Sequence, residues 1–427
     1  MESLKRLSKK KFSVEEAINV CLYAIIFFLP FIVAPFGSDT YYLPKAIFLW
    51  LISGVILMLF IMNRDYKLDL TCKIVVVFVG IILISTLNSL NIKESILGGK
   101  FRWEGAITFI CYGIIFIAAN KYSKLKKKYI DVFLVLGLVM SVYGIFQVYG
   151  YDSLPRDSAH TQSMRCYGLI GHGNFFSTYL LILLGISISR FIFWDDKKCY
   201  VYSLFYVAAL IGTQTRGGWM SLGIFCLAGL FFIIKDFEKI KKAILLVFSF
   251  IIIFFAMDYS KGEELKARFQ TIIEDVTNVT DYSGSSRIAI YRASLTTICK
   301  YPLLGTGPAA LWNSFEKDLP KDSGYFWQRR RGVLGSPIRK VDKVHNELLN
   351  YAATSGIPSM IIYLVMIGMV FTKIINNIRD DKFKVIFIVL FGYVVQANFN
   401  ISVISVAPLF WIILGIGSNS EIIKKID

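Results

Sequence analysis

The stretch "PKAIFLWLISGVILMLFIM" (residues 44–62) contains a single charged residue, Lys45, close to its beginning. A run of about 20 apolar residues is long enough to cross a bilayer as a helix. A helix is favoured there because it satisfies its own backbone hydrogen bonds within lipid. This stretch therefore predicts a membrane-spanning helix.

The composition of the whole chain agrees with that interpretation. Of its 427 residues 55% are hydrophobic and 18% are charged, whereas soluble domains are about 45–50% apolar and about 25% charged. Apolar residues fall into twelve blocks, at 17–36, 44–62, 73–90, 104–120, 129–149, 175–194, 199–213, 218–234, 243–258, 347–371, 384–399 and 402–417.

We therefore predict an all-α integral membrane protein with about 12 transmembrane helices, formed as a single polytopic domain over residues 1–427. The seventh block is short and the last contains Pro408 and two glycines, so eleven to thirteen spans are compatible with the sequence. The ninth and tenth spans are separated by one large, partly helical loop, 259–345.

The distribution of positive charge predicts the orientation. With a cytoplasmic N-terminus, the inner segments carry 26 Lys and Arg and the short outer loops carry seven, while the long loop holds the other 14. Positive residues accumulate on the cytoplasmic side, and long loops do not count in this rule. We expect both termini to be cytoplasmic and the net charge of +17 to face anionic membrane lipids rather than nucleic acid.

The N-terminal sequence "MESLKRLSKKK" is basic, and no small-residue cleavage site follows the first apolar block. We interpret that block as an uncleaved span. Cys166 and Cys299 are the only cysteines predicted to face outward, and either a disulfide or two unpaired thiols fits the sequence. No cysteine or histidine spacing resembles a metal site. The outer loops also have no Asp-x-Asp cluster, so arginine would have to neutralise any phosphate bound there.

All three histidines, His160, His172 and His345, are predicted to lie on the outer side. In "LGGKFRWEG" (97–105), Arg102 and Glu104 are close enough to pair with each other or with neighbours, which favours a structural ion pair. The segment "DSAHTQSMRCYGLIGHGNFF" (157–176) places Asn174 at the start of a span.

Arg216 lies in "GTQTRGGWMS" (212–221), within a short turn between two apolar blocks. One interpretation is an arginine that extends its side chain to lipid phosphates. The other is a ligand site, since Gly217 and Gly218 would leave the backbone open around the guanidinium.

The stretch "SGSSRIAIYRASLTTICKYPLLGTGP" (283–308) predicts a helix that is capped by Ser285 or Ser286 and ends before Pro302. Its expected apolar stripe comprises Ile288, Tyr291, Leu295 and Ile298. Arg287 and Arg292 lie off this stripe, about 140° apart around the helix, so they need not bind the same group.

The segment "YFWQRRRGVLGSPIRKVDKVHNE" (325–347) contains the densest cluster of basic residues on the predicted outer side: Arg329, Arg330, Arg331, Arg339, Lys340 and Lys343. Contact with anionic headgroups would explain this cluster. Capture of a pyrophosphate would explain it equally, because the planar guanidinium binds phosphate oxygens in pairs.

Three motifs in fixed order carry a resemblance: "TQTRGGW" (213–219), "SSRIAIYRA…YPLLGTGP" (285–308) and "HNELLNYAATSGIP" (345–358). Together with twelve spans and one large outer loop, they resemble the O-antigen ligase and polymerase superfamily of bacterial membrane glycosyltransferases. Tyr291 stands where this family often has tryptophan, so an aromatic residue is retained.

The resemblance implies a GT-C-like enzyme of the bacterial plasma membrane, whose active site faces the periplasm or the cell exterior. Such enzymes build lipopolysaccharide or other cell-envelope polysaccharides. They transfer a glycan from an undecaprenyl-pyrophosphate donor to an acceptor hydroxyl with inversion, and they need neither a metal nor another cofactor.

By the same resemblance, Arg216 and Arg287 would hold the donor pyrophosphate and His345 would act at the reaction centre. A neutral imidazole there suits the role of general base. His345 could instead cap the tenth span, or bind phosphate as an imidazolium. We expect further substrate contacts from a second set of residues: Arg292, Arg102, Arg165, Asn174 and Arg339.

The sequence leaves the acceptor open. A ligase would use a lipid, glycan or protein acceptor, a polymerase would extend another lipid-linked repeat, and a protein O-oligosaccharyltransferase would modify a side-chain hydroxyl. A transporter of lipid-linked sugars is a different class that would also need many spans. No clear internal repeat is found, and the polar residues collect on one side, which favours an enzyme.

Overall fold

The computed structural model describes residues 13–35, 39–64, 67–154, 165–277, 283–319 and 340–426. Over these ranges the regular structure is entirely helical, with no strand. The prediction of an all-α protein is confirmed.

Each of the twelve apolar blocks forms a helix. These helices are α2 (Val14–Phe28), α3 (Leu43–Asn63), α4 (Leu70–Leu87), α6 (Ala106–Tyr122), α7 (Lys127–Val148), α8 (Gly173–Trp194), α9 (Lys197–Gly212), α10 (Arg216–Ile233), α11 (Phe237–Ser260), α16 (Glu347–Ile375), α17 (Asp381–Phe399) and α18 (Ala407–Gly417). Within the described residues, nine helices are long and apolar enough to cross a membrane, whereas α6, α9 and α18 are shorter. The chain is a multi-helix membrane protein, and twelve crossings stay a prediction.

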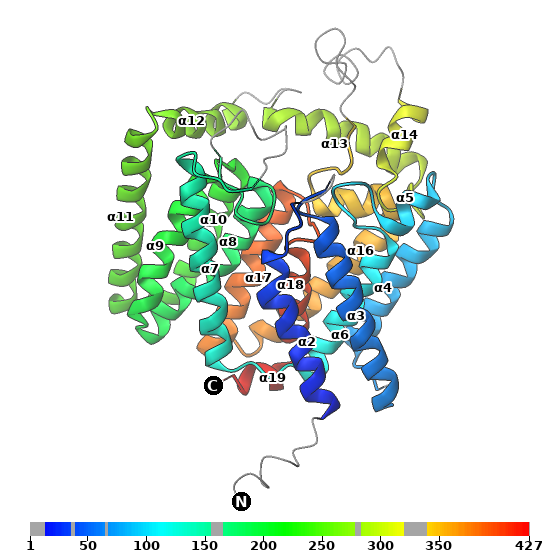
Figure 1. Cartoon of the computed structure of the whole chain (residues 1–427), viewed down its shortest axis with the longest axis horizontal. Helices are drawn as coiled ribbons and strands as arrows, with labels where there is room; N and C mark the ends of the chain where they lie inside the picture. Colours follow the sequence, from blue (N-terminus) through cyan, green and yellow to red (C-terminus); the bar gives the residue numbers. More distant parts are fainter. Residues whose placement is uncertain are drawn as a thin grey trace, which may run out of the picture.

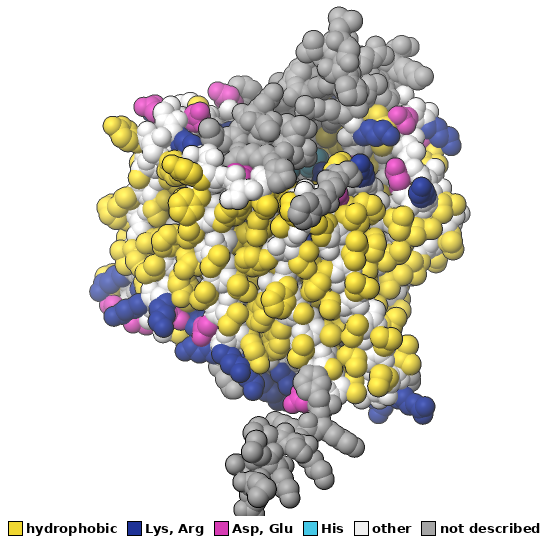
Figure 2. Space-filling model, viewed as in Figure 1, with side chains coloured by type: hydrophobic (Ala, Val, Ile, Leu, Met, Phe, Trp, Pro, Cys, Tyr) yellow, Lys and Arg dark blue, Asp and Glu magenta, His cyan; other side chains and the backbone are white. Residues whose placement is uncertain are grey.

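The helices form an upright bundle with two distinct ends (Figure 1). At the end that we call the terminal end, α2 begins and α19 (Ser420–Lys424) lies. At the opposite end, the loop end, lie α5 (Ile92–Leu97), α12 (Glu264–Thr277), α13 (Ser283–Lys300) and α14 (Leu311–Asp318). Figure 2 shows a broad apolar band between charged side chains at both ends, as expected of a bundle surrounded by lipid.

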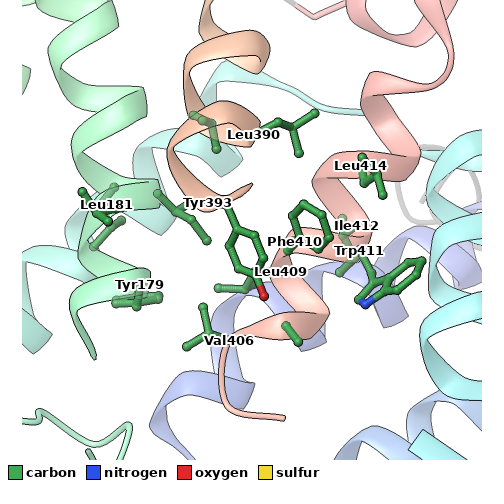
Figure 3. Close-up of a cluster of buried hydrophobic side chains, with 14 of the residues drawn as sticks. Tyr179, Leu181, Leu390, Tyr393, Val406, Leu409, Phe410, Trp411, Ile412 and Leu414 are labelled. Carbon is green, nitrogen blue, oxygen red and sulfur yellow. The ribbon is translucent and has the colours of Figure 1, made fainter. Parts of the chain in front are cut away.

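The centre of the bundle is α8. Its most apolar stretch is 94% buried inside the protein, whereas that of α11 is only 11% buried. Tyr179 of α8 lies near a cluster from α17 and α18 in which the rings of Tyr393 and Phe410 stack 4.0 Å apart (Figure 3). Because α8 is held on all sides, the residues at its two ends are fixed relative to the whole bundle.

Two local predictions are wrong. Pro408 lies in the first turn of α18 and does not break the last apolar block, because proline is tolerated where a helix begins. The second prediction concerns the start of α13, which already begins at Ser283, before the two serines expected to cap it. The helix ends before Pro302, as expected.

The apolar stripe expected on α13 is correct only in part, since Ile298 is buried and Tyr291 packs against the buried cluster, but other positions differ. Leu295 is 51% exposed, whereas the buried face consists of Ile290, Ala293 and Ile298. Small residues permit this face to pack closely, in one cluster with Ala352 and Ala353 of α16.

Candidate functional site

The helix α16 is interrupted at Gly356, whose φ of 85° lies in the left-handed region, two residues before Pro358. Residues 301–308, which we call the strap, lie against this break. The Thr306 amide donates to the Ala353 carbonyl at 3.1 Å, and the Ile357 amide donates to the Pro302 carbonyl at 2.8 Å. Backbone groups released by a helix break must find such partners inside a membrane.

The same contact explains why the break needs glycine. A Cβ at Gly356 would lie 2.1 Å from the Leu303 carbonyl oxygen, and its positive φ would be strained in other residues. The motifs "YPLLGTGP" and "ATSGIP" are therefore two halves of one structural joint. This joint holds α13 over the start of α16.

His345 lies directly below α13. Its backbone carbonyl accepts a hydrogen bond of 3.2 Å from the Tyr291 hydroxyl. Burial raises the pKa of Tyr291, and the positive charge of Arg287 opposes this shift. Since Arg287 precedes Tyr291 by one helical turn, the two lie on the same face of α13. The structure thus brings Arg287 into the neighbourhood of His345, whereas Arg292 is on an exposed part of α13.

The His345 backbone has a φ of 62°, which is unusual for a residue with a side chain. Such a conformation costs about 1–3 kcal/mol and persists only where neighbours impose it. The interpretation that His345 caps α16 is wrong, because Asn346 is the capping residue and accepts from the Leu349 amide at 3.0 Å. His345 is therefore held just outside the helix with its side chain half-buried.

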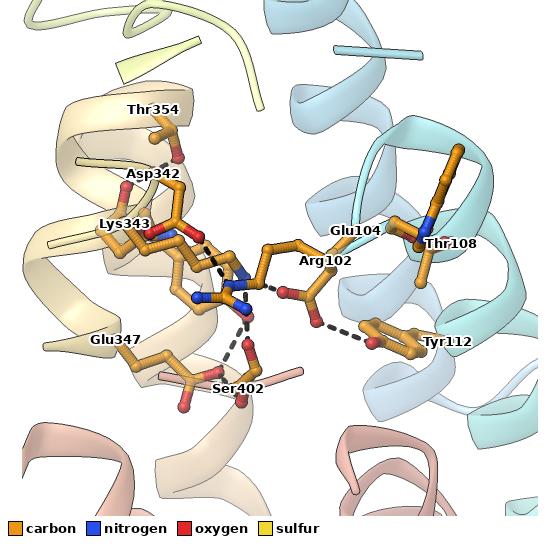
Figure 4. A network of polar contacts seen from close by, with 12 residues as sticks. Arg102, Glu104, Thr108, Tyr112, Asp342, Lys343, Glu347, Thr354 and Ser402 are labelled. Atoms are coloured by element: carbon orange, nitrogen blue, oxygen red, sulfur yellow. Dashed lines mark hydrogen bonds and ion pairs between the residues drawn. The ribbon is translucent and has the colours of Figure 1, made fainter. Parts of the chain in front are cut away.

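A buried polar network supports this turn from below (Figure 4). Lys343 forms an ion pair with Glu104, and both side chains are almost fully buried. The Lys343 ammonium also donates to the Ser402 carbonyl at 3.0 Å. The Ser402 hydroxyl donates to a Glu347 carboxylate oxygen at 2.9 Å.

Arg102 pairs with Asp342, with 2.6 Å between Nε and Oδ2. Its guanidinium also lies 5.4 Å from the ring centre of Phe175. Arg102 and Glu104 thus pair with residues 342 and 343 rather than with each other. These contacts fasten the segment "FRWEG" to the turn that carries His345.

A second polar group surrounds Arg165, immediately before α8. Its Nε donates to the Thr213 carbonyl at 2.7 Å, and a terminal nitrogen lies 3.3 Å from the Asn174 side-chain oxygen. The same nitrogen lies 3.2 Å from the Thr215 hydroxyl. Among the described residues, no carboxylate pairs with Arg165, so its neighbours there are neutral acceptors.

Two further arginines act on Arg165 electrostatically. Burial, followed by the positive charge of Arg268 and then that of Arg216, lowers the pKa of Arg165 to about 10. Arg268 reaches the turn before α10, with its Nε 3.4 Å from the Gln214 carbonyl. Arg216 donates to the Thr271 hydroxyl of α12 at 3.3 Å. We call Arg165, Arg216 and Arg268 the arginine group.

Arg268 is a candidate that the sequence analysis missed. It lies on α12, whose Phe269 packs against Trp219 of α10 and Phe254 of α11, with ring centres 6.3 and 6.2 Å apart. In the sequence, the only feature that could have indicated Arg268 is that an aromatic residue, Phe269, follows it shortly after the ninth apolar block. That signal does not separate a site residue from a surface residue.

The segment "NFNIS" (398–402), which comprises the last two residues of α17 and the three residues after it, connects the two polar groups. The Asn346 amide donates to the Asn398 carbonyl at 3.3 Å, and the Asn400 amide donates to the Asn174 carbonyl at 3.0 Å. The turn of His345 and the neighbours of Arg165 therefore contact one short segment. None of its residues was selected as a site residue from the sequence, because the segment carries no charge.

The interpretation of Gly217 and Gly218 as an opening around Arg216 is wrong. Both are buried within α10, and a Cβ at each would lie 2.9 Å from the Cβ of Phe399 and Ser177, respectively. The two glycines permit α10 to pack closely on α17 and α8. This packing fixes Arg216 at the first position of α10.

Other predicted residues have different positions. His172 caps α8, because its Nδ1 accepts from the Asn174 amide at 3.0 Å. Cys166 is buried and Cys299 is exposed, and both are free thiols, so they do not pair. Arg339, the neighbouring arginines 329–331 and His160 lie outside the described residues. No group of three or more possible metal ligands occurs among the described residues, and the independence from metal stays a prediction.

Comparison with models of protein families gives a match. Residues 201–364 match the family model described as O-antigen ligase. The resemblance seen in the three motifs is confirmed over this range, which contains Arg216, Arg268, Arg287 and His345 but not Arg165 or Asn174. No curated protein matches the chain.

Proposed function

Starting from the match to the O-antigen ligase family, which indicates a membrane glycosyltransferase, we propose that this protein transfers a glycan from a polyprenyl-pyrophosphate donor to an acceptor hydroxyl. By resemblance the polyprenyl chain is undecaprenyl. The observation that carries the proposal is the arginine group at the loop end, where Arg165 is buried among neutral partners beside two other positive charges. Such an arrangement favours an anion with several oxygens.

In this proposal, the arginine group stabilises the negative charge of the leaving pyrophosphate. The acceptor oxygen forms a bond to the anomeric carbon of the glycan, while the bond from that carbon to the phosphate oxygen breaks. The leaving pyrophosphate gains negative charge in the transition state. Guanidinium groups that are already in position stabilise this charge without reorganising.

His345 is the proposed general base that removes the acceptor proton. A neutral imidazole is well suited to accept a proton near neutral pH. The strained backbone at His345 and the hydrogen bond from Tyr291 fix the position of the His345 backbone, from which the imidazole extends. Arg287, on the same face of α13 as Tyr291, would hold the donor phosphate beside the base.

The location of both groups suits a lipid-linked donor. The polyprenyl tail remains in the apolar band, so its pyrophosphate reaches only to the membrane surface. His345 and the arginine group both lie where spans meet the loop end. The acceptor determines whether the enzyme is a ligase or a polymerase, and the assay below separates these outcomes.

The test is reconstitution in liposomes with a defined undecaprenyl-pyrophosphate oligosaccharide, with EDTA present, followed by mass spectrometry of donor and products. Wild-type protein should consume the donor. His345→Ala should lower turnover by about 10²–10⁴-fold, because a positioned base contributes that factor, while its melting temperature remains close to that of wild type.

Turnover of His345→Ala near the wild-type rate would refute the role of His345. Failure of the wild-type protein to consume donor with any lipid, glycan or protein acceptor would refute the transferase proposal. Longer lipid-linked glycans would identify a polymerase. Consumption that requires an added acceptor would identify a ligase.

A further inference from the structure

A cavity of about 870 Å³ opens at the terminal end, between α2, α7, α8, α9, α17 and α18. Ligand cavities in proteins typically measure about 300–1,000 Å³. None of the site residues described above lines this cavity, and it lies at the opposite end of α8 from Arg165. It therefore belongs to neither polar group of the candidate site.

The cavity has two chemically different parts. Much of its lining is aliphatic, with contributions from Ile186, Val389, Ile412 and Ile413, and aromatic side chains such as Phe27 and Phe133 add to the apolar surface. Its charged lining comes from residues 127–131, 190–198 and 382, where α7 and α17 begin and α8 ends. A mainly aliphatic interior with a charged mouth fits an amphiphile with acyl chains.

The charges at the mouth do not cancel. Arg190 is already matched, because its two terminal nitrogens lie 2.5 Å from Asp131 and 2.6 Å from Asp196. Lys127, Lys198 and Lys382 also line the cavity. No carboxylate among the described residues forms an ion pair with these three lysines. The mouth therefore has an excess of positive charge.

We propose that this cavity binds a phospholipid with an anionic headgroup. Its acyl chains would occupy the aliphatic interior, and the headgroup phosphate would lie among Lys127, Lys198 and Lys382. Charge complementarity selects an anionic over a zwitterionic lipid, since each lysine near the membrane surface favours the former. The lipid would join α2 and α7 to α17 and α18. This proposal does not depend on the proposed transferase activity.

The experiment is native mass spectrometry of the purified full-length protein, titrated with phosphatidylglycerol or phosphatidylcholine of identical acyl chains. Wild-type protein should retain phosphatidylglycerol preferentially. The variant Lys198→Gln/Lys382→Gln should lose about fivefold of this preference for each lysine removed. Its binding of phosphatidylcholine should remain, because the aliphatic lining is unchanged.

The matched control is Lys73→Gln/Lys241→Gln, which removes the same charge from exposed lysines outside the cavity lining. It should keep the preference for phosphatidylglycerol. In Ile413→Trp, which fills the aliphatic part, retention of both lipids should fall although thermal unfolding shows a folded protein. Equal loss of preference in the two double variants would overturn the proposal, as would unchanged lipid retention in a folded Ile413→Trp.

Discussion

The two ends of α8 lie near arginines in opposite settings, with the buried Arg190 inside its C-terminal part and the half-buried Arg165 in the segment before its start. At the terminal end, Arg190 is bound by the carboxylates of Asp131 and Asp196. At the loop end, Arg165 is bound by a carbonyl, an amide and a hydroxyl, with Arg216 and Arg268 nearby. The helix α8 thus lies between an arginine that has two carboxylate partners and an arginine that has none among the described residues.

The difference distinguishes an arginine that stabilises the fold through its carboxylate partners, Arg190, from one that we propose binds an anionic ligand, Arg165. A buried charge with a matched partner is a structural element, whereas a buried charge without one is destabilising until an ion of opposite sign binds. Among the described residues, Arg165 has no carboxylate partner that balances its charge. This is the pattern expected of a site that binds an anionic donor.

The largest expected effects come from neutralising Arg165 and Arg190 one at a time, which tests the difference between them. Arg165→Gln should lower glycan transfer by about 10²–10³-fold, as for loss of one preorganised transition-state donor, and should leave the melting temperature of donor-free protein unchanged or higher. Arg190→Gln should lower the melting temperature but keep the turnover of the folded protein. Turnover and thermal unfolding are measured on both variants.

A large loss of turnover in folded Arg190→Gln together with normal turnover in Arg165→Gln would reverse the assignment. Arg165→Lys adds a finer control. A lysine keeps the charge but not the planar fork. We therefore expect its transfer rate to fall between those of wild type and Arg165→Gln.

The second prediction concerns the matched pair at the loop end. Glu104→Gln should destabilise the protein by about 3–5 kcal/mol, because it leaves the Lys343 ammonium buried without its carboxylate. The double variant Glu104→Gln/Lys343→Met should recover most of this loss. Denaturation in mixed detergent gives both values, and a double variant no more stable than Glu104→Gln would refute the pairing.

The third prediction tests the packing that fixes Arg216. Gly217→Ala should cost about 1–3 kcal/mol, because the added Cβ would lie 2.9 Å from the Phe399 Cβ. Gly223→Ala in the same helix is the matched control, since no atom lies within 4 Å of its added Cβ. There the higher helix propensity of alanine should stabilise the protein by up to about 1 kcal/mol. Equal melting temperatures for the two variants would contradict the packing argument.

The smallest expected effect is the contribution of Asp152 to the pH dependence of stability. Although burial raises the pKa of Asp152, hydrogen bonds from Tyr143 and Tyr167 outweigh it, and the pKa is lowered overall. A carboxylate with a lowered folded-state pKa stabilises the protein above about pH 4, its unfolded value, and this contribution is lost as the pH falls. Because the group is only partly buried, the contribution is less than about 1 kcal/mol.

Melting temperature measured from pH 7 to about pH 2 checks this sign, because the contribution is lost only below about pH 4. Asp152→Asn should show a shallower decline than wild type. Asp195→Asn, at the terminal end, removes a fully exposed carboxylate beside Lys242 and should leave the wild-type slope nearly unchanged. A steeper decline in Asp152→Asn would contradict the lowered pKa.

The helices could be predicted from the sequence because an apolar run is a local property. Each of the twelve blocks became a helix, with errors mainly at ends such as the beginning of α18. The joint between the strap and α16 could not be predicted. It pairs the Pro302 carbonyl with the Ile357 amide, and nothing local in either motif specifies that partner.

The candidate site shows the same limit. Arg216, Arg287 and His345 could be selected because charged or titratable residues near predicted spans need an explanation. Asn400 was missed because an uncharged loop attracts no attention in a sequence, and Arg268 because its position depends on how α12 packs. The roles of all these residues in catalysis remain predictions.

The strap has a consequence for biogenesis. Residues 301–308 are synthesised before Gly356, so the partner of the α16 break has left the ribosome before the break itself is made. When α16 enters the bilayer, its carbonyls at Ala353 and Thr354 need the amides of Thr306 and Gly307. Correct insertion of α16 therefore requires that residues 301–308 are already at the loop end, which makes the placement of this segment an early step in assembly of the membrane domain.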